Sequence, residues 1–421
     1  MLAPPASQAF QIRLRRMRYR YAARRDFSQA RNDSPGEHQS ALETDHDVTF
    51  SPERIVRQHI QPVARYAPGV SPIDDPAAVR LDWNESPFGL SPKAREAHDA
   101  YRSGNRYPAI DQHDLISALA NYIGTSPDRV IAGAGLDDVF TTLAIATINP
   151  GDEVIISNPT FGVYRGLFEL HGARVLDVPL GPAPDFALDV DGIIAAANGR
   201  TKLVIVCNPN NPTGTLYSRD DIARIIENVD CLVAIDEAYA EFSGVSHLDL
   251  ANQYPNAILF RTLSKFAGLA GYRVGYGIFP EALMPWIRRA SPAFFNVSAL
   301  SAAVAVASLE DLDHLRGNVA ALVQERGRVT DELNALPGVV AYDSAANFVL
   351  FRLPVDDSGA ITDYLEAHKV FVRRYSGSLR NCLRASVGLP EENTAFLSTL
   401  KEALAHLSSP VMATGTTGAR R

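Results

Sequence analysis

Short apolar runs recur along the middle of the chain, and this feature constrains the fold more than any other. Several are apolar at every position, which is typical of strands that are buried on both faces. Helical segments separate some of them; one begins at Leu136, and another, 218–228, has Ser218 as its cap and isoleucines on one face. The strand-like runs are Arg129–Ala132, Glu153–Ser157, Arg174–Val178, Leu203–Cys207, Leu232–Ile235, Ala257–Phe260 and Val274–Phe279. This alternation predicts an α/β fold with a mostly parallel sheet flanked by helices.

The pattern changes after residue 290. Long helices are predicted at 298–310 and 313–335, then short strands near 346–353 and 381–387 and a helix near 391–406. Because 421 residues exceed the usual size of one hydrophobic core, we expect a second, smaller α+β domain. The predicted division is a disordered arm at 1–47, a small domain from 48–100 and 290–408, a large domain from 101–289 and a disordered tail at 409–421.

Composition and charge exclude several classes of protein. The net charge is −8, which argues against nucleic acid as a bulk partner. The apolar run Ala299–Leu309 is about half the ~20 residues that a membrane span needs, so no membrane partner is expected. The three cysteines, Cys207, Cys231 and Cys382, are far apart and are interpreted as buried free thiols. The histidines show no spacing of a metal site.

The first 31 residues differ from the rest, with eight arginines against the single acid Asp26. An organelle transit peptide is rich in arginine and poor in acids, so this is one interpretation. The alternatives are a disordered basic arm, or an upstream start codon with Met17 as another candidate start. With either of these we expect a cytoplasmic protein.

Four segments carry the chemistry: NPTFGVY (158–164), CNPNNPTG (207–214), AIDEAY (234–239) and TLSKFAGLAGYRVGYG (262–277). Each begins or ends at a strand-like run, where a parallel sheet presents its strand ends to ligands. In the last segment, Lys265 stands among glycines that allow close backbone approach. A desolvated lysine has a lowered pKa and becomes a nucleophile toward a carbonyl carbon. Arg273 would supply a guanidinium fork for a phosphate.

Asp236 closes an apolar strand, so its carboxylate is expected to be buried and paired. A protonated pyridine nitrogen is a suitable partner, because it makes the ring an electron sink; a helix cap is the alternative role. Asn211 and Tyr239 could hydrogen-bond a phenolic oxygen of such a ring. Phe161 offers a flat face for stacking on it.

The segment IAGAGLDDVF (131–140) combines a strand, a glycine-rich turn and a helix start. The backbone N–H groups of Leu136 and Asp137 would form a phosphate cradle. The segment also resembles the start of a dinucleotide-binding fingerprint, but Asp138 occupies the place of the third glycine.

These segments, in this order, resemble the fold-type I pyridoxal-phosphate aminotransferases, and most closely the histidinol-phosphate aminotransferase group. The resemblance covers residues 52–406. It also includes YAPG (66–69), NESPFG (84–89), NRYP (105–108) and CLRASVG (382–388). It implies pyridoxal 5'-phosphate as cofactor, held by Lys265 as a Schiff base, with Asp236 on the ring nitrogen.

The resemblance implies further roles. Asn211 and Tyr239 would bind the phenolic oxygen of the cofactor, Phe161 would stack on its ring, and Ser264, Arg273, Leu136 and Asp137 would hold its phosphate. Tyr107 would reach the cofactor phosphate of a neighbouring subunit, which makes the active unit a homodimer with shared active sites. Arg384 would clamp the anionic group of the substrate, with Tyr66 and Arg373 near it.

Two departures from the family pattern are visible. The group often has GADE where this chain has GLDD (135–138), so the acid at Asp138 is shorter. The segment between Arg373 and Arg384 is also two residues shorter than expected for the family. This segment lies where the family binds the anionic end of the substrate.

The implied reaction is a reversible ping-pong transfer of an amino group between an amino donor and a 2-oxo acid, with 2-oxoglutarate and glutamate as one pair. Histidinol phosphate is the expected donor, because Arg373 beside Arg384 suits a dianionic phosphate. An aromatic amino acid, or a different reaction such as decarboxylation of a phosphorylated amino acid, is the alternative. The non-enzyme alternative is a cofactor-sensing transcription regulator. Such a protein would need a folded DNA-binding domain of about 60 residues ahead of the aminotransferase part. Only about 45 residues without clear apolar periodicity precede that part here, which argues against a regulator.

Overall fold

The computed structural model describes residues 51–64, 72, 74–292 and 296–408. The described residues from Pro52 onward form one compact unit. The predicted arm at 1–47 and tail at 409–421 lie outside the described residues. Within the described part of the chain, no helix has the length and apolarity that crossing a membrane requires.

The larger of two sheets has seven strands in the order β2-β8-β7-β6-β5-β3-β4. Its neighbours pair in parallel except at β8, which is antiparallel to both β2 and β7. The strands are β2 (Val130–Ala134), β3 (Glu153–Ile156), β4 (Arg174–Asp177), β5 (Thr201–Cys207), β6 (Leu232–Asp236), β7 (Ala257–Thr262) and β8 (Val274–Ile278). All seven predicted strands are therefore present, and the mostly parallel α/β fold is confirmed.

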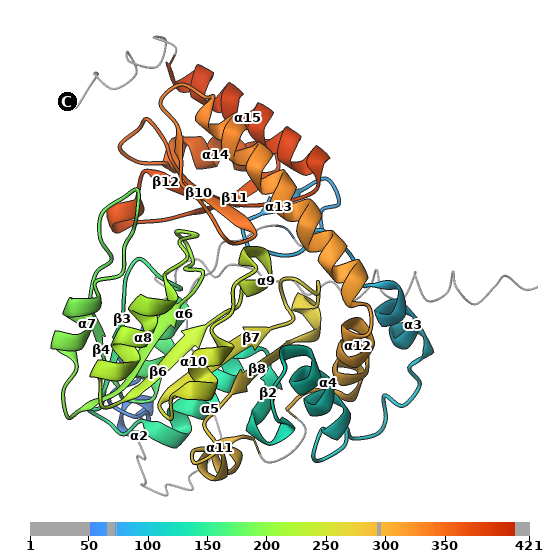
Figure 1. Ribbon diagram of the computed structural model, residues 1–421. Coiled ribbons are helices and arrows are strands. Elements are labelled where there is room, and N and C mark those ends of the chain that lie inside the picture. Colours follow the sequence, from blue (N-terminus) through green and yellow to red (C-terminus); the bar gives the residue numbers. More distant parts are fainter. Residues whose placement is uncertain (1–50, 65–71, 73, 293–295, 409–421) are drawn as a thin grey trace, which may run out of the picture. The chain divides into compact units, whose positions relative to one another are not determined.

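Helices cover both faces of this sheet (Figure 1), which explains why its strands are apolar throughout. In β5, Val204 and Val206 pack into one core, whereas Leu203, Ile205 and Cys207 pack into the other. The first core contains residues of α4 (His113–Ile123), α7 (Val190–Ala196), α8 (Arg219–Asn228), α10 (Leu248–Gln253) and α12 (Ala299–Leu309). The second core contains residues of α5 (Leu136–Thr147), α6 (Val163–Leu170) and α11 (Met284–Ala290).

The predicted cap of α8 is observed. The Ser218 hydroxyl accepts a hydrogen bond from the backbone N–H of Asp221 at 3.1 Å, which satisfies one of the free N–H groups of the first turn. Ile222, Ile225 and Ile226 are buried on the inner face of the helix. The sequence pattern thus gave both the start and the buried face of this element.

The smaller sheet has five strands in the order β1-β11-β12-β10-β9, and β1 pairs in parallel with β11 while its other pairs are antiparallel. Its strands are β1 (Val79–Leu81), β9 (Val340–Ala341), β10 (Phe348–Arg352), β11 (Val370–Arg374) and β12 (Cys382–Ser386). Its core is completed by α13 (Leu312–Asn334), α14 (Gly359–Ala367) and α15 (Pro390–Ser408). This is the smaller α+β part that the sequence predicted.

Two features connect the sheets. The long helix α13 packs Leu315 and Leu322 into the core of the larger sheet, and Val329 and Leu333 into the core of the smaller one (Figure 1). Helix α3 (Pro92–Ala100) packs against α12. Both helices belong to the predicted small domain, yet Ala94 of α3 and Val304 of α12 pack into the core of the larger sheet. The domain boundaries given above stay a prediction.

Several elements were not predicted. β1 is only three residues long and includes the polar Arg80, and β11 buries only every second residue at its start. Neither makes the continuous apolar run that revealed the larger sheet. The sequence analysis also gave no range for several further elements. These are α2 (Pro52–Ile55), α3, α4, α6, α7, α9 (Ala240–Ser243), α10, α11, α14, β9 and the 3-10 turns η1 (Pro127–Arg129), η2 (Ala270–Tyr272) and η3 (Gly377–Leu379).

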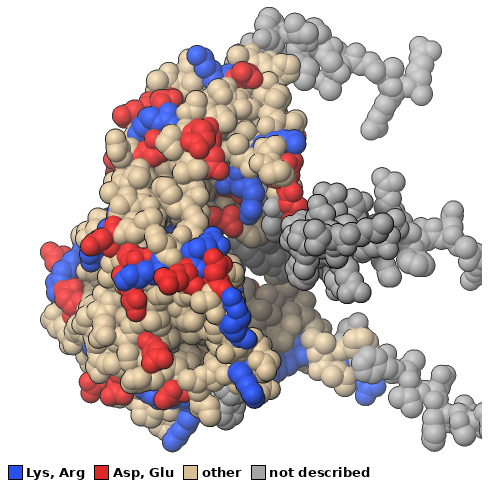
Figure 2. All heavy atoms as spheres, turned by 90° about the vertical axis from the view of Figure 1, so that its right-hand side faces the viewer, with Lys and Arg blue, Asp and Glu red and all other residues tan. Residues whose placement is uncertain are grey.

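The surface mixes charges of both signs. On the face in Figure 2, basic and acidic side chains lie interspersed over the described residues. This distribution accords with the modest negative net charge of the whole sequence.

Glu153, the first residue of β3, is a buried carboxylate at the amino end of the larger sheet. Asn198 donates to its Oε2 at 2.7 Å, and Arg200 and Arg174 lie 2.8 and 3.2 Å from its Oε1. The hydrogen bond from Asn198, followed by the positive charge of Arg200, holds the pKa of Glu153 below its ordinary value, against the opposing effect of burial. The charged form of Glu153 therefore stabilises the junctions at the start of β3, β4 and β5.

We predict that Glu153→Gln destabilises the protein in a pH-dependent way. A carboxylate whose pKa is lowered by folding stabilises above its unfolded pKa of about 4.3, and this contribution is lost as the pH falls through the lower folded value. The denaturation midpoint of the variant should therefore lie below that of the wild type at about pH 7 and approach it below about pH 4. Asp313→Asn, which removes an exposed carboxylate paired with Arg316, should give no such convergence. A constant difference at all pH values would contradict the assignment.

Candidate active site

The carboxyl ends of the parallel strands meet at one edge of the larger sheet, and the predicted segments gather there. Ligands of open α/β sheets bind at this edge. Segment 131–140 runs from β2 into α5, 158–164 runs from the end of β3 into α6, 207–214 follows β5, 234–239 closes β6, and 262–277 joins β7 to β8. The segments that the sequence analysis singled out thus lie at the same end of the sheet.

Lys265 follows the end of β7 and is partly buried. Its Nζ donates a hydrogen bond to the carbonyl oxygen of Trp83 at 3.0 Å. Burial, and then the positive charges of Arg384 and Arg273, lower the pKa of this amine to about 8. A lowered pKa leaves more of the amine unprotonated near neutral pH, and an unprotonated amine is what attacks a carbonyl carbon.

Asp236 is the last residue of β6, and its side chain is buried. Its Oδ2 accepts a hydrogen bond from the hydroxyl of Tyr164, and its Oδ1 accepts one from the backbone N–H of Ala238 at 3.0 Å. Burial raises the pKa of Asp236 to about 6 in spite of these bonds. A cationic group placed against the carboxylate would favour its charged form.

A chain of hydrogen bonds joins Tyr239 to the smaller sheet. The Tyr239 hydroxyl accepts from Asn211 Nδ2 at 3.1 Å and from Asn84 Nδ2 at 3.0 Å. Asn211 Oδ1 in turn accepts from Arg384 Nη1 at 2.7 Å. Both bonds to Tyr239 use lone pairs of its oxygen, so its hydroxyl proton can still be donated to a ligand.

Arg384 lies on β12 with its side chain buried. Its Nη2 donates to the carbonyl oxygen of Asp82, and its guanidinium lies 5.2 Å from the ring centre of Phe348. Among the described residues, its buried Nε has no hydrogen-bond partner. An unpartnered charged donor in a buried position suits an anionic ligand.

Arg373 of β11 is the register partner of Arg384 across the antiparallel pair β11–β12. Directly opposite residues of an antiparallel pair lie on the same face, and like charges there are destabilising. The two arginines are thus placed as the sequence predicted, and an anion between them would offset their repulsion.

The glycine-rich turn before α5 is shaped by close contacts. A Cβ at Gly275 would lie 2.3 Å from the backbone N of Leu136, and a Cβ at Gly135 would lie 2.2 Å from Arg273 Nη2. The Arg273 guanidinium therefore rests on the turn, beside the first N–H groups of α5. Those N–H groups have no partner within the helix, and they attract anions.

Two further predicted residues complete this cradle. Ser264 lies just past Thr262, which is the register partner of Gly275, and its hydroxyl accepts a hydrogen bond from the Thr262 hydroxyl at 2.9 Å. The Asp137 carboxylate lies 3.5 Å from Arg273 Nη2. A cradle of N–H groups, a hydroxyl and a guanidinium fits a phosphate group.

The shortened acid at position 138 has a structural role. Asp138 Oδ2 accepts hydrogen bonds from the backbone N–H of Ala134 at 2.9 Å and from Asn296 Nδ2 at 3.1 Å. A Cβ at Gly133 would lie only 2.9 Å from the same oxygen. The residue that departs from the family pattern, Asp138, therefore stabilises the glycine-rich turn before α5 through its side-chain hydrogen bonds.

The other predicted residues lie in different surroundings. Phe161 is partly buried, and its ring meets the ring of Tyr164 edge-on at 5.4 Å. Tyr107 is 82% exposed. Tyr66 lies outside the described residues.

Sequence reasoning missed Tyr164 and Asn84 as site residues, although both stand in segments that were singled out. Tyr164 binds Asp236, and Asn84 binds Tyr239. The φ of Asn84 is 53°, a left-handed conformation that asparagine tolerates better than most residues. The preference of asparagine for this conformation is a sequence signal that could have drawn attention to Asn84. No neighbouring residue in the sequence indicates that Tyr164 contacts Asp236.

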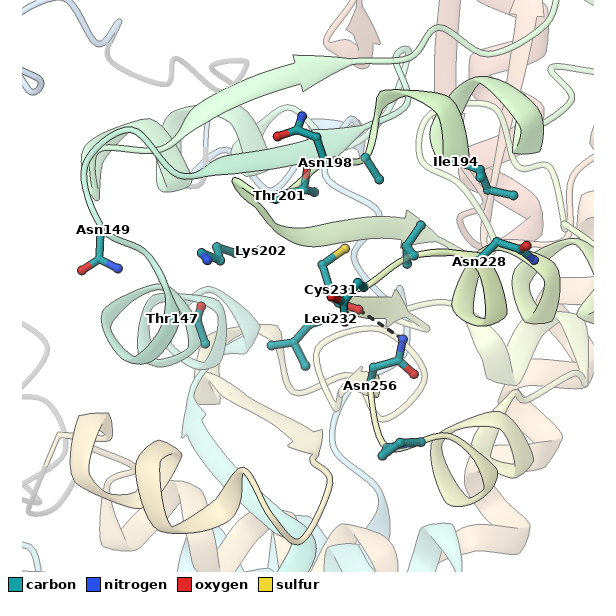
Figure 3. A pocket seen from close by; sticks show the side chains of 15 residues that line it. Thr147, Asn149, Ile194, Asn198, Thr201, Lys202, Asn228, Cys231, Leu232 and Asn256 are labelled. Atoms are coloured by element: carbon teal, nitrogen blue, oxygen red, sulfur yellow. Dashed lines mark hydrogen bonds between the residues drawn. The ribbon is translucent and has the colours of Figure 1, made fainter.

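A cavity of about 1050 Å³ lies at the opposite end of the larger sheet. Figure 3 shows its polar lining, which includes Asn149, Asn198, Lys202, Asn228 and Asn256. These residues lie near the amino ends of β5, β6 and β7. The cavity is therefore separate from the strand ends that carry Lys265 and Asp236.

The residues around Lys265 fit one kind of ligand. The cradle at the start of α5 suits a phosphate, Asp236 suits a protonated ring nitrogen, and Tyr239 can donate to a ring oxygen. The amine of Lys265 suits an aldehyde carbon. A phosphorylated pyridine aldehyde combines all four groups.

Comparisons with known proteins point the same way. Residues 77–400 match the family model "Aminotransferase class I and II". The chain is 40% identical to a histidinol-phosphate aminotransferase of Roseiflexus castenholzii over 77% of this chain and 89% of that protein. It is 34% identical to one of Dehalococcoides mccartyi over 84% of this chain and 99% of that protein. The structure is similar to that of histidinol-phosphate aminotransferase from Sinorhizobium meliloti in complex with pyridoxal-5'-phosphate, with a TM-score of 0.76, 27% identity, and coverage of 86% of this chain and 100% of that one.

We predict that Gly275→Ala destabilises the protein by about 1–3 kcal/mol, as expected when extra volume forces the backbone to shift in a packed region. The added methyl group would displace the start of α5. Gly271→Ala is the matched control, because a Cβ at Gly271 would meet no atom within 4 Å. Chemical denaturation of the two cofactor-free variants measures the difference. Equal midpoints for both variants would show that the contact with Leu136 relaxes freely.

Proposed function

The chain belongs to the class I and II aminotransferases, and we propose that it transfers the amino group of histidinol phosphate to a 2-oxo acid. As a member of this family it is a transaminase that depends on pyridoxal 5'-phosphate and acts on an amino donor and a 2-oxo acid. The proposal adds the identity of the amino donor, with 2-oxoglutarate as the acceptor. A cytoplasmic location stays a prediction from the sequence.

The residues at the strand ends support the following roles. When bound, the cofactor supplies an electron sink for the carbanion that forms at the substrate carbon. Lys265 would hold the cofactor through its amine and later move the proton at the substrate carbon. Its lowered pKa of about 8 suits both tasks, since the group must change protonation state near neutral pH.

The remaining cofactor contacts follow from the geometry above. Asp236 would keep the ring nitrogen protonated, and Phe161 would stack on the ring. Asn211 and Tyr239 would bind the ring oxygen. The phosphate would be held by Ser264, Arg273 and the backbone N–H groups of Leu136 and Asp137.

The observation that carries the choice of substrate is the register pair of Arg373 and Arg384. Arg384 is hydrogen-bonded to Asn211 and so lies next to the proposed cofactor ring. Two guanidinium groups on one face of the sheet suit a dianionic phosphate ester better than a single carboxylate. The names of the relatives, which are histidinol-phosphate aminotransferases, support the same substrate.

We also propose a homodimer with shared active sites. Tyr107 is a large aromatic residue that is 82% exposed, on a segment ahead of the phosphate cradle in the sequence. Its proposed role is to donate a hydrogen bond to the cofactor phosphate of a second subunit. A two-fold dimer would then build two composite sites.

We predict that histidinol phosphate converts the bound cofactor to its amino form more efficiently than histidinol, phenylalanine or aspartate. Arg373→Gln should raise the apparent dissociation constant for histidinol phosphate by about tenfold to a hundredfold, as expected for one lost charged hydrogen bond, and leave the reaction of histidinol unchanged. The absorbance of the bound cofactor in a single half-reaction measures both. Arg374→Gln is the matched control, because Arg374 is paired with Asp357.

Two results would contradict the proposed substrate. A preference for phenylalanine would favour the aromatic alternative. Release of carbon dioxide from a phosphorylated amino acid, with no amino form of the cofactor, would favour decarboxylation.

We predict that Tyr107→Phe and Lys265→Ala complement one another if the sites are shared. Tyr107→Phe should weaken cofactor affinity by about tenfold to a hundredfold, and Lys265→Ala should abolish turnover. In a mixed dimer, one site carries both changes and the other carries neither. Mixed dimers should regain about half the wild-type activity per dimer at limiting cofactor, as two independent sites imply. Absence of recovery after proven subunit exchange would place Tyr107 in the site of its own chain.

A further inference from the structure

Tyr164 lies in the first turn of α6, two residues past the turn that carries Gly162, and its side chain is fully buried. Its hydroxyl donates to Asp236 Oδ2, while the backbone N–H of Ala238 donates to Asp236 Oδ1. Each oxygen of the carboxylate therefore has a fixed donor. This pair of bonds sets the orientation of the Asp236 side chain.

The ring of Tyr164 makes a second set of contacts. It meets Phe161 edge-on at 5.4 Å with an interplanar angle of 85°, and it meets Phe140 of α5 at 5.4 Å with an angle of 66°. Phe161 is the residue proposed to stack on the cofactor ring. One buried side chain thus contacts both residues that are proposed to touch that ring.

The alternation of the sheet explains how these residues meet. Cys207 is the register partner of Asp236 and points into the same core as Tyr164 and Phe140. Ala234, two residues before Asp236, points into that core as well. Asp236 therefore faces the layer of α5 and α6, and the hydroxyl of Tyr164 on α6 reaches it from that layer.

We propose that Tyr164 is a positioning residue for the cofactor ring, because its hydroxyl orients Asp236 toward the ring nitrogen and its ring fixes Phe161 against the ring face. This inference rests on the proposed roles of Asp236 and Phe161. Tyr164 touches neither cofactor nor substrate in this proposal and acts through its two neighbours.

The groups around Asp236 define the electrostatic part of the role. Burial raises the pKa of Asp236 most, and the negative charges of Asp137 from α5 and of the adjacent Glu237 raise it further. Burial raises the pKa of the Cys207 thiol to about 12, so that thiol stays neutral beside Asp236. The Tyr164 hydroxyl counteracts these effects, because a hydrogen bond to a carboxylate favours its charged form.

Tyr164→Phe tests the proposal, because it removes the hydroxyl and keeps the ring. Tyr276→Phe is the matched control: Tyr276 is a fully buried tyrosine whose hydroxyl has no hydrogen-bond partner in the described part of the chain. Each variant is loaded with pyridoxal 5'-phosphate labelled with nitrogen-15, and the chemical shift of the ring nitrogen is followed against pH. The signal comes only from folded, loaded protein, so a moderate loss of stability does not obscure it.

In Tyr164→Phe the ring-nitrogen signal should move toward the unprotonated position, because Asp236 becomes the stronger competitor for the shared proton. The acid limb of the kcat/KM profile should move up by about one pH unit, as expected when a hydrogen bond to a charged group is lost. Cofactor affinity should fall by about tenfold. Tyr276→Phe should match the wild type in all three measurements.

Two outcomes separate failure of this inference from failure of the proposed site. If Tyr164→Phe matches Tyr276→Phe in ring-nitrogen shift, pH profile and cofactor affinity, Tyr164 only fills the core and the inference is overturned. If Asp236→Asn itself leaves the ring-nitrogen signal of the wild type unchanged, the role of Asp236 is wrong. The double variant Tyr164→Phe/Asp236→Asn should show no change in the ring-nitrogen signal beyond that of Asp236→Asn, and an additive change would place the action of Tyr164 elsewhere.

Discussion

Burial of both faces of the seven-stranded sheet is the constraint on which the rest of the structure depends. Because helices cover each face, successive residues of a central strand must be apolar, and polar side chains are confined to the strand ends. Asp236 is the last residue of β6, where a carboxylate can be reached by donors from a neighbouring helix and loop. The reactive side chains therefore lie at the ends of the strands, because the core between those ends is apolar.

That edge alone does not complete the site. The loop after β5 supplies Asn211, and its side chain joins Tyr239 of the larger part to Arg384 of the smaller one. The segment after β1 adds Asn84 to the same phenol oxygen. A displacement of the smaller sheet would therefore change hydrogen bonds at Tyr239 directly. In the proposed function, recognition of the substrate by the arginines and binding of the cofactor ring would therefore be coupled through the Asn211 side chain.

The strands of the larger sheet and the segments around it could be predicted from the sequence, because continuous apolar runs and glycine-rich turns are local signals. β1 and β11 could not, since one is three residues long and the other buries residues only alternately at its start. The same distinction holds in the site. Lys265 and Asp236 were predicted from their neighbours in the sequence, which are glycines for Lys265 and an apolar strand for Asp236. The contact of Tyr164 with Asp236 depends instead on which face of the sheet α6 covers. A role that arises from packing between distant segments cannot be predicted from the sequence of either segment alone.

The pairing of β1 with β11 has a consequence for how the protein acquires its site during synthesis. The backbone N–H of Asn84 donates to the Ser386 hydroxyl at 2.8 Å, across 302 positions of the chain. All seven strands of the larger sheet have been synthesised once β8 is complete, but the Ser386 partner of Asn84 follows only with β12, about 110 residues later by the strand bounds given above. Asn84, which donates to Tyr239, therefore lacks its bond to Ser386 until β12 has been synthesised. Completion of the site is consequently delayed until almost the whole sequence has been translated.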